Sequence, residues 1–206
     1  TQQINPKEEI DLGNKTGVIG VLPLFHSYAH TVIMNSVVCV GAWAALFPKP
    51  PPSEELLRTV SQLPNYNYFI YPGVEILFQR IAELSQTIIN KYQFHQYLKI
   101  CASAAGPLHD YVRTPFETKT QAKLTELYGL TEASPGVSAN NFYGLRESGT
   151  LGVPLPGTDW KIFPQDNFDA GPITERGESG TGEICITGPQ VMKGYWQNPD
   201  RTADNI

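Results

Sequence analysis

Short apolar runs alternate with amphipathic stretches through the first two thirds of the chain. Five runs are apolar without strict alternation, a pattern typical of parallel strands that are covered on both faces. They are residues 18–25 (VIGVLPLF), 37–47 (VVCVGAWAALF), 68–71 (YFIY), 98–103 (LKICAS) and 122–129 (AKLTELYG). Helical patterns lie between some of these runs. The alternation of strands and helices predicts a parallel α/β sheet.

Two segments show the helical pattern. Residues 53–63 (SEELLRTVSQL) carry two glutamates in the first turn, where the helix dipole favours anions, and Ser53 is the candidate N-cap. Pro72 fits the start of a second helix over residues 72–90. Its expected apolar face consists of Val74, Leu77, Phe78, Ile81 and Leu84.

The longest uncharged stretch, residues 31–47, is at the lower limit for a membrane-spanning helix. Asn35 and Ser36 interrupt it, and Gly41 precedes a proline-rich stop at residues 48–52. These breaks predict a buried helix that runs into a buried strand. We therefore do not expect this segment to span a membrane.

The pattern changes after about residue 146. Residues 149–166 and 180–196 are short β-type runs broken by glycine and proline, with no helical period. We therefore predict two units: a layered α/β subdomain with a parallel sheet over residues 1–145, and part of a β-barrel-like subdomain over residues 146–206.

Composition narrows the classes of protein. Of 206 residues, 41% are hydrophobic and 17% charged, which excludes a disordered chain or a coiled coil. The 18 glycines and 17 prolines argue against an all-helical bundle. The formal net charge is −5, and no basic run is present to neutralise a row of phosphates. We expect no nucleic-acid partner.

The three cysteines indicate the compartment. Cys39, Cys101 and Cys185 each lie inside an apolar run, and no CxxC pair occurs. We interpret them as buried free thiols in a reducing environment, and no targeting segment is visible, so a cytoplasmic location is expected. The chain begins without a methionine, which suggests a piece of a longer protein.

Three loops that follow predicted strands contain residues suited to binding a ligand. They are PLFHSYAH (23–30), SAAGPL (103–108) and YGLTEASPG (128–136). Ligands of an open parallel sheet bind at the carboxyl ends of its strands, so these loops form the candidate site. The small residues of SAAGPL would let a flat ligand lie against the backbone, and Tyr128 offers a ring for stacking. Thr131 and Glu132 pair a hydroxyl with a hard carboxylate, which suits a phosphate and Mg²⁺. Together these features suggest a nucleotide.

Each feature also has a purely structural interpretation. A small-residue run that ends in Gly-Pro often just precedes a helix, Tyr128 alone is compatible with packing, and Glu132 alone is compatible with a helix N-terminus. His26 and His30 have i, i+4 spacing, but no third ligand has a recognisable spacing, so zinc is not expected. Neither a G-x-S-x-G elbow nor a G-x-x-x-x-G-K-[ST] loop occurs, which disfavours hydrolases and P-loop proteins.

The order of four motifs resembles one enzyme family. SAAGPL, LYGLTEASPG, GTLGVPLPG and GEICITGPQVMKGYWQNPDRTADNI together resemble adenylate-forming enzymes, specifically acyl-CoA ligases of the long-chain fatty acid and 4-coumarate type. The resemblance covers nearly the whole chain. It implies an enzyme that activates a carboxylate with ATP to an acyl-adenylate and pyrophosphate, then passes the acyl group to coenzyme A.

The resemblance also implies a role for each site residue. Tyr128 would stack on adenine, Thr131 would contact the α-phosphate, and Glu132 would hold Mg²⁺. His26 would lie beside the reacting carboxylate, where it orients the acid and stabilises charge on the transferring phosphate. Adenine would lie along Ala104, Ala105 and Gly106, and the acyl tunnel would be lined by Tyr28 and Gly129. Ala104 and Ala105 replace the more usual Gly-Gly or Gly-Ala, and Ala29 replaces a frequent Gly, which puts the shape of the pocket in question more than its chemistry.

Some family motifs do not occur in these 206 residues. They include the Ser/Thr/Gly-rich phosphate loop ending in Pro-Lys-Gly, the ribose-binding Thr-Gly-Asp and the C-terminal domain with its catalytic lysine. The chain therefore resembles the middle of the ligase, and we expect it to be inactive alone. Three alternatives remain: a fatty acyl-AMP ligase, a peptide-synthetase adenylation domain, or a non-catalytic nucleotide- or acyl-binding module. An acyl substrate would favour at most peripheral membrane contact. The acyl chain length, the oligomeric state and the acceptor stay open.

Overall fold

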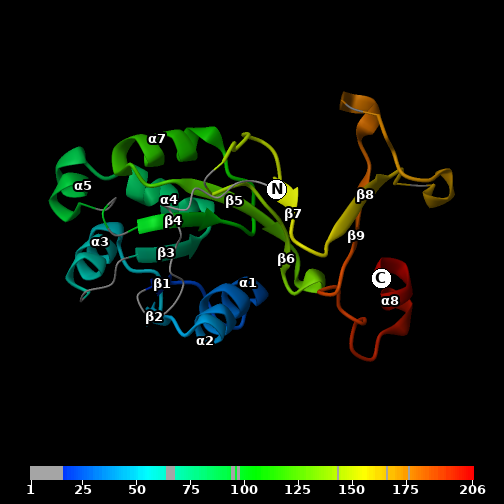
Figure 1. Ribbon diagram of the computed structural model, residues 1–206, viewed down its shortest axis with the longest axis horizontal. Coiled ribbons are helices and arrows are strands. Elements are labelled where there is room, and N and C mark those ends of the chain that lie inside the picture. The colour runs from blue at the N-terminus through cyan, green and yellow to red at the C-terminus, as the bar shows by residue number, and fades with distance from the viewer. Residues whose placement is uncertain are drawn as a thin grey trace.

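A mostly parallel sheet forms the centre of the molecule (Figure 1). The computed structural model describes residues 16–63, 68–93, 96, 98–142, 144–165, 167–175 and 177–206. The sheet has seven strands in the order β2-β1-β3-β4-β5-β6-β7. The parallel strands are β1 (Thr16–Gly20), β2 (Trp43–Leu46), β3 (Tyr68–Gly73), β4 (Leu98–Ser103) and β5 (Leu124–Gly129). At one edge, β6 (Gly136–Ala139) and β7 (Val153–Pro154) add antiparallel pairs.

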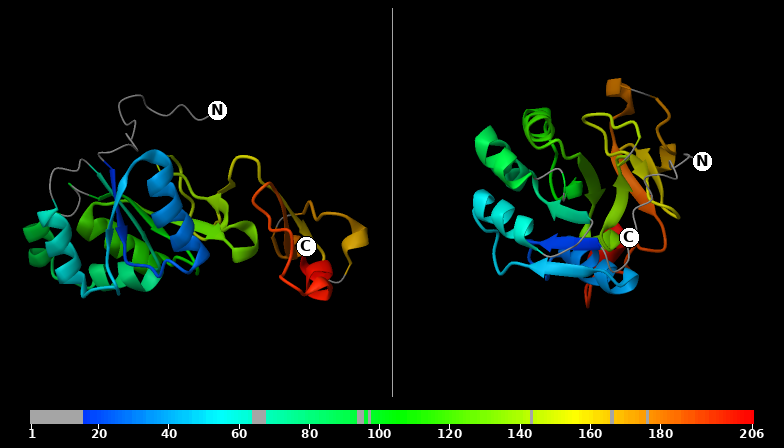
Figure 2. Two further views of the ribbon diagram at one scale, coloured as in Figure 1. Left: turned by 90° about the horizontal axis from the view of Figure 1, so that it is seen from below. Right: turned by 60° about the vertical axis from the view of Figure 1, so that its left-hand side comes forward.

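Helices cover both faces of the parallel strands, which gives three layers (Figure 2). One face carries α3 (Ser53–Gln62), α4 (Glu75–Ala82), α5 (Gln86–Tyr92) and α7 (Asp110–Thr120). The other face carries a continuous helical segment made of α1 (Ser27–Ala29), the π-helical turn η2 (His30–Asn35) and α2 (Ser36–Val40).

The alternation of side chains along β1 supplies two cores. Ile19 points to the larger core, where it packs with Phe69, Phe78 and Phe116 beneath the four-helix face. Val18 points the other way and packs with Ala29 and Ile33 of the α1–η2 segment. Each face of the sheet therefore carries a buried core, as the runs without strict alternation predict.

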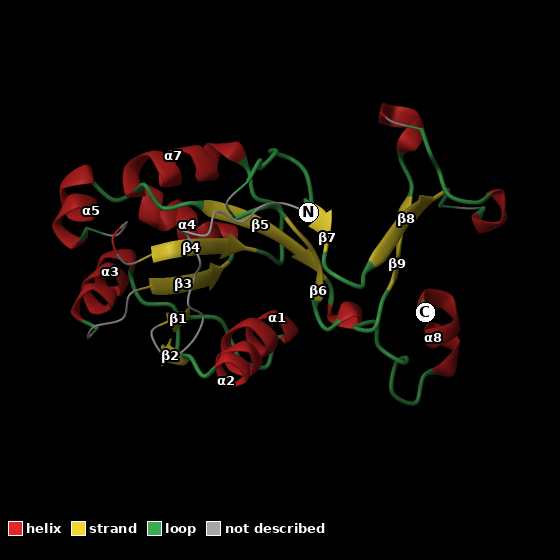
Figure 3. Ribbon diagram, viewed as in Figure 1, coloured by secondary structure: helices red, strands yellow, loops and turns green. Residues whose placement is uncertain are grey.

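The predicted parallel α/β sheet is confirmed, and Figure 3 shows its strands between the helices. Strand β4 has the bounds that the sequence indicates, and β3 and β5 agree within two residues. Strand β1 is shorter than residues 18–25 suggest, because it ends at Gly20, three residues before Pro23. Strands β6 and β7 were not predicted as separate elements, because each is short.

A helix runs into a strand over residues 31–47, as expected, but the expectation that the strand is buried is wrong, because no residue of β2 is fully buried. The helix also differs from the prediction. The VVCV run is helix α2 and not part of a strand, and none of its residues is buried. Gly41 ends the helix in a left-handed conformation (φ 66°), and β2 begins only at Trp43. The preference of β-branched residues for strands is overridden by continuation of the preceding helix.

Two helix starts also differ from the prediction. Pro72 lies inside β3, and the expected single helix over residues 72–90 is the pair α4 and α5. Ser85 separates them, because its hydroxyl accepts a hydrogen bond from the Ile88 amide and caps α5. Ser53 is the first residue of α3 and makes no capping hydrogen bond, since Pro52 occupies the N-cap.

Helix α7 was missed by the sequence analysis. Pro115 lies inside it and obscures the pattern, because proline normally breaks a helix. Val112, Phe116 and Thr120 are nevertheless buried on one face. Their spacing of four residues was the available signal.

A two-stranded antiparallel hairpin follows the sheet. It consists of β8 (Asp159–Phe163) and β9 (Glu183–Thr187), joined through the 3-10 turns η4 (Phe168–Ala170) and η5 (Gly177–Gly180). Helix α8 (Pro199–Asn205) ends the chain beyond β9 (Figure 1). The division near residue 146 stays a prediction, and β7 beyond it still joins the seven-stranded sheet.

The cysteines are free, as predicted, but they are not equally buried. Cys101 is fully buried in the larger core, Cys185 is half-buried and Cys39 is exposed on α2. The expectation that Cys39 is buried is therefore wrong, since α2 turns it away from the sheet. Across the described residues, no helix has both the length and the apolar character needed to cross a membrane.

Candidate functional site

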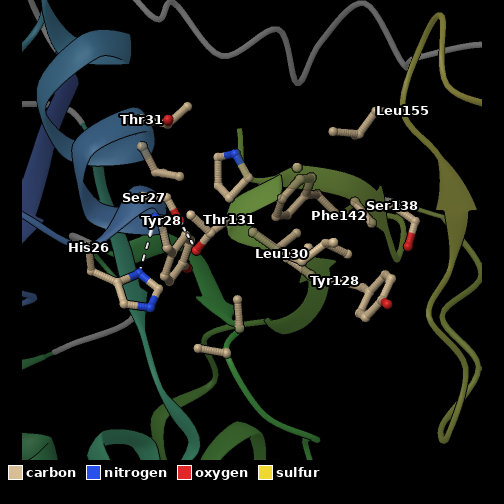
Figure 4. Close-up of a pocket in the computed structure, with 18 residues that line it drawn as sticks. His26, Ser27, Tyr28, Thr31, Tyr128, Leu130, Thr131, Ser138, Phe142 and Leu155 are labelled. Atoms are coloured by element: carbon tan, nitrogen blue, oxygen red, sulfur yellow. Dashed lines mark hydrogen bonds between the residues drawn. The ribbon is translucent and has the colours of Figure 1, made fainter. Parts of the chain in front are cut away.

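The three predicted loops meet at the carboxyl edge of the parallel strands, around a pocket of about 500 Å³ (Figure 4). Its lining includes seven residues that the sequence analysis singled out: His26, Tyr28, Ala104, Ala105, Tyr128, Gly129 and Thr131. Gly106 lines a neighbouring cavity of about 410 Å³ that shares Ala105, Tyr128 and Gly129 with the first. In the view of Figure 4, His26 and Tyr128 lie at opposite ends of the pocket and Thr131 lies between them.

His26 is an exposed residue at the start of α1. It is the N-cap residue, and its Nδ1 accepts a hydrogen bond of 3.2 Å from the Tyr28 amide. An accepting Nδ1 carries no proton, so the neutral ring carries its proton on Nε2. The cap therefore fixes one ring nitrogen and leaves the other as a donor. His30 is exposed one turn later.

Tyr28 anchors α1 to the sheet. Its side chain is buried, and its hydroxyl donates a 3.1 Å hydrogen bond to the carbonyl of Ala102 on β4. Burial raises the pKa of this phenol, so Tyr28 stays neutral at physiological pH. Tyr28 also lines the pocket. Because its amide binds His26 and its hydroxyl binds Ala102, it links His26 to the buried strand β4.

The loop after β4 has one strained position. Ala104 is buried, and its amide donates a 3.2 Å hydrogen bond to the carbonyl of Gly73. Ala105 is exposed and has a φ of 64°, in the left-handed region that favours glycine. An alanine at this position therefore carries backbone strain that a glycine would not.

The loop after β5 approaches its own hairpin closely at Gly129. A Cβ atom at this position would collide with the carbonyl of Pro135. Any larger residue at position 129 would therefore displace the segment that carries Thr131 and Glu132. The requirement for glycine is steric, since Gly129 has no positive φ.

Two contacts join the α1–η2 segment to this loop. The hydroxyls of Ser27 and Thr131 are 3.2 Å apart, and the Thr31 hydroxyl lies 3.5 Å from the carbonyl of Ser134. Figure 4 shows the Ser27 contact as a dashed line. Sequence reasoning did not identify Ser27, because a contact across more than a hundred residues leaves no local pattern.

Glu132 lies just outside the lining of the pocket. Its Oε1 accepts a 2.6 Å hydrogen bond from the Tyr195 hydroxyl, and its carbonyl accepts a 2.7 Å hydrogen bond from the Met192 amide. The hydrogen bond from Tyr195 is the main cause that lowers the pKa of Glu132, so this carboxylate is ionised at neutral pH. Tyr195 was quoted within a family motif, but it was not identified as a site residue.

Apolar side chains complete the pocket. They are Val32, Leu127, Leu130, Phe142 and Leu155. A few convergent polar groups in an otherwise apolar wall are typical of a small-molecule site. Within the described residues, no group of three or more His, Cys, Asp or Glu side chains is arranged to hold a metal ion.

Known proteins resemble the chain over most of its length. The long-chain-fatty-acid–CoA ligase of Bacillus subtilis (strain 168) is 35% identical over 186 residues, which cover 90% of this chain and 31% of that protein. The 4-coumarate–CoA ligase 1 of Arabidopsis thaliana is 31% identical over 194 residues, which cover 92% of this chain and 32% of that protein. The chain thus spans about a third of the length of these relatives.

Solved structures share the fold. ATP-bound MatB from Rhodopseudomonas palustris superposes with a TM-score of 0.77 at 23% identity, and covers 94% of this chain and 35% of its own. The long-chain-fatty-acid-CoA ligase FadD1 from Archaeoglobus fulgidus gives a TM-score of 0.71 at 22% identity, with 92% and 38% covered. The family model described as AMP-binding enzyme matches residues 1–196. This chain therefore belongs to the AMP-binding enzyme family.

Proposed function

We propose that the complete protein carrying this chain is an ATP-dependent acyl-CoA ligase. It activates a carboxylic acid, a long-chain fatty acid, as the acyl-adenylate and then transfers the acyl group to coenzyme A. The observation that carries this proposal is the pocket at the carboxyl edge of the sheet, which gathers His26, Ala104 and Thr131 from three loops. The resemblance to long-chain-fatty-acid–CoA ligases supports the class of substrate.

The nucleotide occupies the side of the site nearest Tyr128. Adenine lies along the backbone of Ala104, Ala105 and Gly106, where the small side chains leave room for a flat ring, and Tyr128 stacks on it. Tyr128 lines both cavities, so its ring is accessible from each. Thr131 then contacts the α-phosphate with its hydroxyl, which its contact with Ser27 holds at the pocket wall.

Mg²⁺ fits the donor set at Glu132. This ion is commonly bound by one or two carboxylates together with substrate phosphates, and not by a cage of protein ligands. Glu132 is one ionised carboxylate beside the phosphate-contacting Thr131, and no cluster of further ligands surrounds it among the described residues. Bound there with the nucleotide, Mg²⁺ would neutralise charge on the phosphates.

The acid lies between His26 and the apolar wall. A carboxylate oxygen of the acid attacks the α-phosphorus of ATP, and the bond to the pyrophosphate oxygen breaks. His26 donates from Nε2 to an oxygen of the reacting groups, since its Nδ1 is occupied by the Tyr28 amide. Tyr28 and Gly129 line the acyl tunnel. The thiol sulfur of coenzyme A then attacks the acyl carbon, and AMP leaves.

Product analysis tests this function. The complete protein is incubated with palmitate, ATP, Mg²⁺ and coenzyme A, and the products are separated by mass spectrometry. We expect palmitoyl-CoA, AMP and pyrophosphate in equal amounts, and none of them without the acid. Palmitoyl-AMP that accumulates beside unused coenzyme A would instead identify a fatty acyl-AMP ligase, and turnover with amino acids alone would identify a peptide-synthetase adenylation domain. Nucleotide binding without turnover would identify a non-catalytic module.

A further inference from the structure

The segment after β9 returns to the turn that carries Glu132. Three hydrogen bonds make this contact: from the Met192 amide to the Glu132 carbonyl (2.7 Å), from the Tyr195 hydroxyl to Glu132 Oε1 (2.6 Å), and from the Gln190 amide group to the Gly136 carbonyl (3.2 Å). Two end on backbone carbonyls and fix the path of the chain, and the one from Gln190 is donated by its side-chain Nε2. The third reaches the carboxylate itself, and the proposed function gives that contact no role.

Tyr195 is held by its own support. Its amide donates a 2.9 Å hydrogen bond to the Thr202 hydroxyl, and the Arg201 guanidinium lies 4.6 Å from the centre of its ring. Both partners belong to α8, which begins where the Asn198 side chain accepts a hydrogen bond from the Arg201 amide. Thr202 therefore fixes the backbone of Tyr195, and Arg201 stacks on its ring. These two contacts hold the Tyr195 hydroxyl beside Glu132.

A neutral donor suits this position. None of the ion pairs in the described part of the chain includes Glu132. A lysine or arginine in contact would cancel the negative charge that a cation needs, whereas a phenol fixes the carboxylate and leaves that charge in place. The Tyr195 hydrogen bond is made to Oε1. The backbone amide of Glu132 and the charge of Arg201 also lower the pKa of this carboxyl, but Arg201 forms no ion pair with it among the described residues.

We propose that Tyr195 is a positioning residue that orients the Glu132 carboxylate for the metal–nucleotide complex, with Arg201 and Thr202 of α8 bracing it. The proposal rests on the role proposed for Glu132. It assigns a function to the motif around Tyr195, which the proposed mechanism leaves unused. Hydrogen-bond partners of this kind typically change metal affinity or activity by about 10- to 100-fold.

The test compares Tyr195→Phe with Tyr92→Phe in the complete protein. Tyr92 is a matched control, because its hydroxyl also donates to a glutamate, Glu54, at 3.4 Å, in a contact between α5 and α3 that does not line the pocket. Mn²⁺ binding in the presence of ATP is measured by electron paramagnetic resonance. We expect Tyr195→Phe to weaken Mn²⁺ binding by about 10-fold, and Tyr92→Phe to match the wild type.

Turnover supplies a second readout. Tyr195→Phe should need about 10-fold more Mg²⁺ for half-maximal adenylation and should recover its rate in excess Mg²⁺, whereas Glu132→Gln should not recover. A double Tyr195→Phe/Glu132→Gln variant should be no worse than Glu132→Gln alone, because the phenol acts through the carboxylate.

The outcomes separate the two proposals. Unchanged Mn²⁺ affinity in Tyr195→Phe, beside a weakened Glu132→Gln, overturns the positioning role and leaves the proposed function intact. A lowered melting temperature with unchanged Mn²⁺ affinity makes Tyr195 purely structural and also overturns it. A wild type that binds no Mn²⁺ with ATP overturns the proposed function at Glu132 itself.

Discussion

His26 illustrates how a single backbone contact can set the chemistry of a side chain. The Tyr28 amide donates to its Nδ1, and Tyr28 is in turn fixed by the Ala102 carbonyl in the buried layer. The orientation of the imidazole therefore depends on a chain of contacts that ends in β4. Nε2 is left as the donor, which is the atom that the proposed function uses toward a reacting oxygen.

The role of His26 is tested by separating the two half-reactions in the complete protein. We expect His26→Ala to slow adenylation by roughly 10- to 1,000-fold, the range for loss of one such donor. Thioester formation from preformed acyl-adenylate should change much less, because no phosphate is transferred in that step. His30→Ala serves as the control, since His30 is exposed and does not line the pocket. Equal losses in both half-reactions, with a lower melting temperature, would show that His26 is structural.

The sequence was sufficient to predict that residues at or just after the end of a strand would line the pocket. Tyr128 and Thr131 follow or end β5, Ala104 and Ala105 follow β4, and all four line the pocket. Residues that depend on distant packing were not predictable. Ser27 and Tyr195 contact the turn after β5 from about 104 and 63 residues away in the sequence, and nothing near them in the chain indicates a partner.

At the scale of elements, one polar network ties three parts of the fold together. The Arg146 guanidinium pairs with Glu117 of α7 through both terminal nitrogens and donates to the carbonyl of Leu124 in β5. Glu117 also accepts a 2.7 Å hydrogen bond from the Leu124 amide. The segment after β6 is thus attached to the helix and the strand that carry the site loops.

This network predicts a local loss of stability in Arg146→Lys, because lysine cannot make the two parallel hydrogen bonds. We expect the free energy of local opening of β5 and α7 to fall by about 1 to 2 kcal/mol, as judged by hydrogen–deuterium exchange of the complete protein. Arg113→Lys is the control, because its pair with Asp110 lies on one helix and the Asp110 side chain is 57% exposed. Its effect should stay below about 0.5 kcal/mol. Equal effects of the two substitutions would contradict this assignment.

The type of an element, helix or strand, was predictable where its hydrophobic pattern and its local propensity agreed. Strand β4 lies in a mostly apolar run, LKICAS, and was bounded correctly, whereas the VVCV run of α2 has strand-type residues in a helix that has no buried residue. Helix α7 carries Pro115, and Pro72 lies in a strand and not at a helix start. In each case the tertiary setting of the segment outweighed its local propensity.

At the scale of the whole molecule, the topology of the sheet determines where the candidate site residues lie. Parallel strands from β1 to β5 bring their carboxyl ends to one edge, so loops far apart in the sequence share one pocket. This consequence was predictable from the alternation of elements alone. The attachment of the segment after β9 was not, because it rests on the contacts of Met192 and Tyr195 with a single turn.

Acid-dependent exchange of pyrophosphate into ATP, measured for the complete protein and its Glu132→Gln variant, tests the central claim most directly. This exchange reports formation of the acyl-adenylate without the second half-reaction. We predict exchange that requires a long-chain fatty acid and Mg²⁺, and that falls by on the order of 100-fold or more in Glu132→Gln, as loss of an electrostatic transition-state contact does. Exchange that proceeds without an acid, or that is unchanged in Glu132→Gln, would contradict the assignment of adenylation to this site.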